Sequence, residues 1–121
     1  MTAPQADWPI DMAVFTQIAG SKASKMLPIL IPVFLEDGDL LMGWMGEAFQ
    51  NDDPIKLQHA AHRLKGNSAS LGVTTIASLA EQLENWGKMG DLVTAVQPYT
   101  ALSQEYTKVK SALLDLISQV E

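Results

Sequence analysis

The chain has 121 residues, 47% of them hydrophobic and 18% charged, a composition typical of one globular domain and unlike that of a disordered chain. It contains no cysteine, which excludes disulfides and thiolate metal sites and favours a cytoplasmic setting. The net charge of −6 repels a phosphate backbone, so we expect no nucleic-acid partner.

The hydropathy pattern predicts no membrane segment. The most apolar run, residues 26–35, contains two prolines and is about half as long as a spanning helix. We expect no membrane partner. Along the chain, we expect residues 1–9 to be a flexible N-terminal segment and residues 10–121 to form a single helical domain.

The first two elements are expected to be a short helix and a long one. Asp11 is a suitable cap for a helix that ends near Ile18, and Gly20 and Ser21 separate it from a helix over about residues 24–50. Apolar residues at helical spacing mark the buried side of this long helix: Ile31, Leu35, Leu41, Met42, Met45 and Phe49.

The third helix is expected to begin at Pro54, after a turn over residues 51–53, and to end before Gly72. Its inward stripe consists of residues spaced three or four apart: Leu57, Ala61, Leu64, Ser68 and Leu71.

A fourth helix should start at residues 73–75 and end between Gly87 and Gly90, and a fifth should run from Leu92 or Pro98 to Val120. Their inward stripes are Ile76, Leu79, Ala80, Leu83 and Trp86, and then Leu102, Tyr106, Val109, Leu113, Leu116 and Val120. Four long amphipathic helices joined by short turns predict an all-α fold, an antiparallel four-helix bundle with the additional short N-terminal helix across one end.

His62 is the candidate reactive residue of this bundle. A helix advances by about 100° per residue, which places His62 roughly 140° from the centre of the buried stripe of the third helix, in water. Lys65 and Gly66, one turn further, share that outer face with it, as does Ala69. A neutral imidazole is nucleophilic and an ammonium neutralises phosphoryl oxygens, so this grouping suits a phosphorylated histidine.

The same residues also have simpler interpretations. A lone helical histidine is usually a solvated surface residue, and His59 lacks the surrounding pattern. A metal site of His59, His62 and Glu84 is a weak alternative, because two histidines three residues apart carry no further ligand motif. The tryptophans mostly fit core or end packing, although Trp8 and Phe15 are alternatives for a docking face.

The segment around His62 resembles a known family. Residues 61–72, Ala-His-Arg-Leu-Lys-Gly-Asn-Ser-Ala-Ser-Leu-Gly, match the signature A-H-x-L-K-G-x-[SA]-x-x-[LI]-G of histidine-containing phosphotransfer (HPt) domains at every defined position. Residues 79–84, Leu-Ala-Glu-Gln-Leu-Glu, resemble the next helix of that family at the expected spacing.

The resemblance implies a role for each matching residue. His62 would accept a phosphoryl group on Nε2, Lys65 would hold its oxygens, and Gly66 would leave room for the partner. Some family members carry a glutamine that hydrogen-bonds the histidine, and the matching position here is Glu84. A carboxylate could orient Nδ1–H but would repel the phosphoryl group, so the roles of Glu84 and of its neighbour Gln82 stay open.

The resemblance also implies partners. We expect response-regulator receiver domains and a hybrid sensor kinase to dock near His62, on a patch that includes Arg63, Ala69, Leu71 and residues of the first two helices. The sequence contains no Gly-rich ATP loop, so no kinase activity and no cofactor are expected, and Mg²⁺ would belong to the receiver. The predicted function is transfer between receiver aspartates by a monomer; the alternative is a non-transferring helical adaptor that regulates a receiver or kinase by binding.

Overall fold

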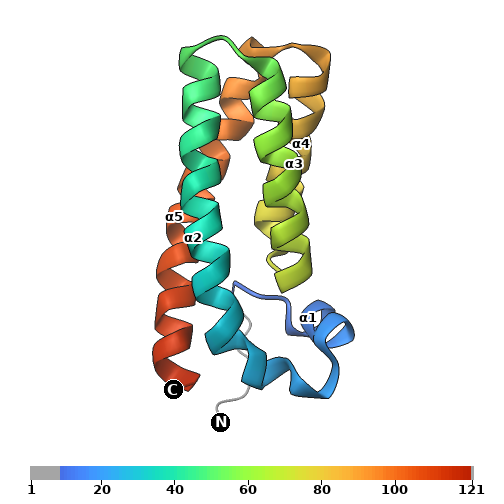
Figure 1. Ribbon diagram of the computed structural model, residues 1–121, viewed down its shortest axis with the longest axis vertical. Coiled ribbons are helices and arrows are strands. Elements are labelled where there is room, and N and C mark those ends of the chain that lie inside the picture. The colour runs from blue at the N-terminus through green and yellow to red at the C-terminus, as the bar shows by residue number, and fades with distance from the viewer. Residues whose placement is uncertain (1–8, 121) are drawn as a thin grey trace.

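The computed structural model describes residues 9–120, which are helical almost throughout and include no strand (Figure 1). In chain order the elements are α1 Met12–Ala19, the 3₁₀ turn η1 Gly20–Lys22, α2 Ala23–Gln50, α3 Pro54–Leu71, α4 Thr74–Met89 and α5 Leu92–Val120. None of the helices in this part of the chain is long and apolar enough to span a membrane.

The four long helices run alternately up and down, with α3 packed between α2 and α4, and α5 closing the bundle against α2 and α4 (Figure 1). The short helix α1 lies across the end where α3 stops (Figure 1). The Asp11 backbone N–H donates to the Gly72 carbonyl at 2.7 Å and ties the start of α1 to the α3–α4 turn. The predicted antiparallel four-helix bundle with a short N-terminal helix is confirmed.

Aspartate caps begin three of the helices. The carboxylates of Asp11, Asp53 and Asp91 accept from backbone N–H groups two or three residues ahead, which satisfies donors that the first helical turn leaves free. The cap at Asp91 starts α5 at Leu92, so the alternative start at Pro98 is wrong.

The predicted inward stripes form the core. Most of their members are less than a tenth exposed, while Leu79, Trp86, Met42 and Phe49 are partly buried against that core. Phe15 is only 1% exposed, so the suggestion that it belongs to a docking face is wrong. Residues 1–8, including Trp8 and nearly all of the predicted N-terminal segment, and the side chain of Val120 lie outside the described part of the chain.

Helices α3 and α4 pack closely against each other, and a glycine of α4 lies at their contact. At Gly87 of α4, a Cβ atom would lie 2.8 Å from the backbone nitrogen of Gln58 and 2.9 Å from the carbonyl oxygen of Pro54. Backbone atoms cannot turn aside as a side chain can, so only glycine allows this spacing. The sequence pattern indicated Gly87 only as part of a helix end.

We predict that Gly87→Ala destabilises the fold by about 2 kcal/mol or more, because the added methyl group must push α3 away from α4. Gly43→Ala is the matched control, since a Cβ atom there meets nothing within 4 Å and alanine is favoured over glycine in a helix by roughly 1 kcal/mol. Urea unfolding of the two variants should give opposite shifts in midpoint. Equal shifts would contradict the close contact at Gly87.

Candidate functional site

His62 stands on the outer flank of α3, where its side chain is 67% exposed. Its neighbours in sequence, Ala61 and Leu64, are fully buried and fix the rotation of the helix about its axis. At Gly66, one turn on, a Cβ atom would meet nothing within 4 Å. The imidazole therefore faces open space, as the helical periodicity predicted.

Glu84 of α4 holds the inner side of the imidazole. Its Oε2 lies 2.7 Å from Nδ1 of His62, and the residue is only 4% exposed. An ionised carboxylate can only accept a hydrogen bond, so the ring proton resides on Nδ1. The lone pair of the neutral ring is then on Nε2, the nitrogen that points away from Glu84.

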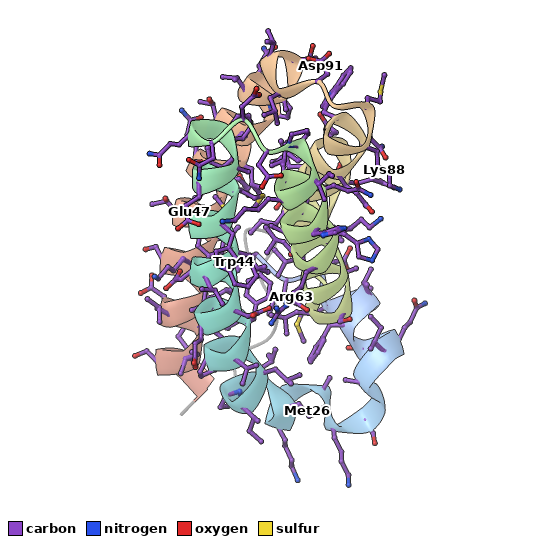
Figure 2. The ribbon with its side chains drawn as sticks, turned by 45° about the horizontal axis from the view of Figure 1, so that its top comes forward. Met26, Trp44, Glu47, Arg63, Lys88 and Asp91 are labelled. Atoms are coloured by element: carbon purple, nitrogen blue, oxygen red, sulfur yellow. The ribbon has the colours of Figure 1, made fainter. Side chains whose placement is uncertain are left out.

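Two ammonium groups complete the surroundings of this carboxylate. Lys65 Nζ lies 2.7 Å from Oε1 of Glu84, and Lys88 Nζ lies 3.6 Å from Oε2. The Lys88 side chain is 54% exposed and extends from α4 on the outer flank of the bundle (Figure 2). We call His62, Lys65, Glu84 and Lys88 the Glu84 cluster.

The hydrogen bond from Lys65 is the largest influence that lowers the pKa of Glu84 below its usual range, and His62 adds to it, while burial acts in the opposite direction. The same bond raises the pKa of Lys65. At neutral pH Glu84 is an anion and Lys65 a cation. The imidazole therefore lies next to an ion pair whose two charges cancel.

The structure distinguishes Glu84 from Gln82, the two residues of α4 that were candidates for contact with His62. Glu84 reaches His62, whereas Gln82 is exposed and takes no part in the side-chain hydrogen bonds found among residues 9–120. Lys88 was missed by the sequence analysis, although its position four residues after Glu84 is the spacing at which helical side chains pair.

His59 is exposed and lines a shallow hollow with Trp44 and Ile55, one turn before His62. Within the described ranges, no group of three histidine, aspartate or glutamate side chains is placed to hold a metal ion.

A groove lies between α2 and α3, and Arg63, the residue that follows His62, lines it. Arg63 of α3 and Asp37 of α2 cross it with an ion pair in which Nε donates over 3.1 Å, and Asn67 donates to the same carboxylate. Figure 2 shows Arg63 in front of the space between the two helices. The α2–α3 groove has a volume of about 520 Å³, and its apolar lining is Leu30, Val33, Phe34, Leu40 and Leu71.

Comparison with known proteins agrees with this architecture. The family model of the Hpt domain matches residues 30–120. The chain therefore belongs to the Hpt domain family, the histidine-containing phosphotransfer domains of two-component phosphorelays.

Individual relatives are more distant. The chain is 24% identical over 88 residues to the phosphorelay protein LuxU of Vibrio vulnificus strains YJ016 and CMCP6. The aligned segment covers 73% of this chain and 76% of each relative. Its fold is similar to that of histidine-containing phosphotransfer protein B (HptB) from Pseudomonas aeruginosa PAO1, with a TM-score of 0.79, 22% identity, and coverage of 95% of this chain and 98% of the other.

We predict that the stability advantage of the wild type over Glu84→Gln depends on pH. Because folding lowers the pKa of Glu84, its ionised form stabilises the native state above the unfolded pKa of about 4.5, and this contribution is lost as the pH falls through the folded pKa. The variant should be about 1–2 kcal/mol less stable near neutral pH, and the gap should narrow in acid.

Urea unfolding at about pH 7 and at successive lower pH values measures this gap. Glu81→Gln, the same change at an exposed position of α4, is the control and should follow the wild type throughout. If the difference in unfolding free energy between wild type and Glu84→Gln stays constant down to about pH 3, folding does not lower the pKa of Glu84 and the prediction is wrong.

Proposed function

We propose that this protein is a phosphorelay intermediate that accepts a phosphoryl group on Nε2 of His62 from a receiver-domain phospho-aspartate and passes it to the aspartate of another receiver. The observation that carries the proposal is the exposed Nε2 of an imidazole whose Nδ1 is held by Glu84. A nucleophile must present its lone pair to the incoming group, and this ring has one nitrogen fixed and the other free.

Lys65 and Gly66 have supporting roles in this proposal. Lys65 reaches Glu84 over 2.7 Å, next to the ring, and its long side chain brings a positive charge to the phosphoryl oxygens. Gly66 presents no side chain on the approach to His62, and the space above its backbone is open. Position 66 therefore puts no side chain in the way of a receiver aspartate that approaches the ring.

The names of the relatives agree with this proposal. The curated relatives are named as phosphorelay proteins and the solved structure as a histidine-containing phosphotransfer protein. Family membership supports a carrier of phosphoryl groups. The receiver-to-receiver direction and the absence of kinase activity of its own are parts of our proposal, as is the extent of the phosphotransfer domain over residues 10–121 in a cytoplasmic monomer.

The transfer step needs a partner. The Nε2 lone pair attacks phosphorus, the Nε2–P bond forms, the bond between phosphorus and the aspartyl oxygen breaks, and that electron pair returns to the receiver carboxylate. Mg²⁺ bound by the receiver would neutralise the phosphoryl oxygens, so this chain supplies position, one nucleophile and nearby positive charge.

We further propose that the receiver docks over the α2–α3 groove and the adjacent surface of α3. The groove combines apolar side chains with the Arg63–Asp37 ion pair, which matches the apolar centre and polar rim of a transient interface. Val33 is 62% exposed within it, and Ala69 is exposed further along α3. The groove lies next to His62, so a receiver seated there can reach the ring.

The first test is the transfer itself. When the protein is mixed with a phosphorylated receiver and Mg²⁺, we expect acid-labile, base-stable phosphate on the wild type and on His59→Gln, and none on His62→Gln. Phosphate that persists in His62→Gln would assign the acceptor to another residue. Binding of receivers without any labelled phosphohistidine would favour the adaptor function in place of transfer.

The second test concerns docking. Val33→Asp should weaken productive binding of the receiver by roughly tenfold, because it places a charge in the apolar centre of the interface. Val93→Asp is the control, since Val93 is 87% exposed at the start of α5 and lies outside the groove. The half-saturating receiver concentration in a transfer assay measures the effect. An equal change in both variants, or none in either, would place the interface elsewhere.

A further inference from the structure

We propose that Glu84 is a positioning residue that keeps Nδ1 of His62 protonated after phosphorylation as well as before it, so that the phosphorylated ring is an imidazolium. This inference rests on the proposed function and concerns what the protein does with the phosphoryl group. It explains why a carboxylate, and not a neutral amide, lies 2.7 Å from Nδ1.

The protonation state decides which leaving group the transfer produces. Once phosphorus is bonded to Nε2, a ring that keeps its Nδ1 proton carries a positive charge, and cleavage of the Nε2–P bond releases neutral imidazole. A ring that has lost that proton would have to leave as an imidazolate anion, a far poorer leaving group. Rapid onward transfer therefore requires the proton on Nδ1 at the moment of reaction.

Glu84 is placed to hold that proton. Its carboxylate is buried, and its other oxygen pairs with Lys65 at 2.7 Å, which holds it against the ring. A negative charge 2.7 Å from Nδ1 favours the cationic ring, whereas a glutamine oxygen would accept the same hydrogen bond without that charge. No proton then needs to enter or leave the protein when the phosphoryl group arrives or departs.

The other charged groups near the ring affect the protonation of Nδ1 less directly. Lys88 and Lys65 oppose a cationic ring, but both ammonium groups contact Glu84, and a phosphoryl group on Nε2 offers them oxygens of opposite charge. Glu81 acts on Lys65 from the exposed side of α4, and His59 stands on α3 itself, one turn before His62. Only Glu84 makes a direct hydrogen bond to the ring among the residues described.

The consequence is a carrier that passes its phosphoryl group on and does not store it. Over the neutral pH range the wild-type phosphohistidine should remain in its reactive form. With glutamine at this position, the same linkage should lose its Nδ1 proton as the pH rises and become longer-lived.

The experiment uses phosphoramidate, a small phosphoryl donor that makes phospho-His62 without any receiver. The wild type, Glu84→Gln and the control Glu81→Gln are labelled with ¹⁵N, and Nδ1 of phospho-His62 is followed by NMR from about pH 6 to 9. The protein has only two histidines, and His59→Gln identifies their signals. The rate of phosphate loss is recorded in the same samples, and the rate of transfer to a receiver is recorded in parallel.

We expect the wild type and Glu81→Gln to keep Nδ1 protonated to above pH 8, with a rate of phosphate loss that changes little over this range. In Glu84→Gln the proton should be lost within the range, and the rate should then fall by about tenfold for each pH unit above the midpoint. Transfer to the receiver should slow in parallel.

Two outcomes would overturn the inference. One is the loss of the Nδ1 proton from phospho-His62 of the wild type near neutral pH. This measurement does not depend on whether a variant folds. The other is an identical pH profile in wild type and Glu84→Gln. Failure of the proposed function looks different, because His62 would then accept no phosphoryl group from a receiver at any pH, whatever the state of Nδ1.

Discussion

The site depends on one buried carboxylate. Glu84 lies between α3 and α4 and contacts three nitrogen-bearing side chains, of which only His62 and Lys65 come within 2.7 Å. This contact requires the two helices to be close, and their closeness requires Gly87, where no Cβ atom could be accommodated against the backbone of α3. A packing constraint one turn beyond Glu84 therefore sets the position of the imidazole. Chemistry and core packing are coupled through the same pair of helices.

Burying a charge is costly, and the cluster shows how the cost is offset. An unpaired carboxylate inside a protein would take up a proton, but Lys65 and the imidazole of His62 hydrogen-bond Glu84 and keep its pKa low, and a second ammonium group, that of Lys88, lies 3.6 Å away. With two lysines and one glutamate, the cluster has a formal charge of +1 when the ring is neutral. It can therefore receive a doubly negative phosphoryl group with less repulsion than the carboxylate alone would cause. The lysines make a buried glutamate tolerable at this position.

Local sequence patterns were sufficient for the helices and for the outward direction of His62, because both depend on spacing within one segment. They were not sufficient for Glu84 and Lys88. Whether a side chain of α4 reaches His62 depends on how far α4 slides along α3, and that register is set by contacts such as Gly87 against Gln58. The start of α5 was uncertain for a related reason. Pro98 resembles a helix start, yet the cap at Asp91 and the burial of Ala95 extend the helix backward past it.

His62 lies at the boundary between two different surfaces of α3. On one side the Glu84 cluster is polar and contacts Nδ1 of the ring; on the other the α2–α3 groove is largely apolar and is crossed by the Arg63–Asp37 ion pair. No residue of the groove lining belongs to the cluster. If a receiver docks over the groove, as proposed, substitutions there can change partner recognition without altering the side chains that contact His62. The two ring nitrogens differ in the same way: Nδ1 faces the Glu84 cluster, and Nε2 faces away from it.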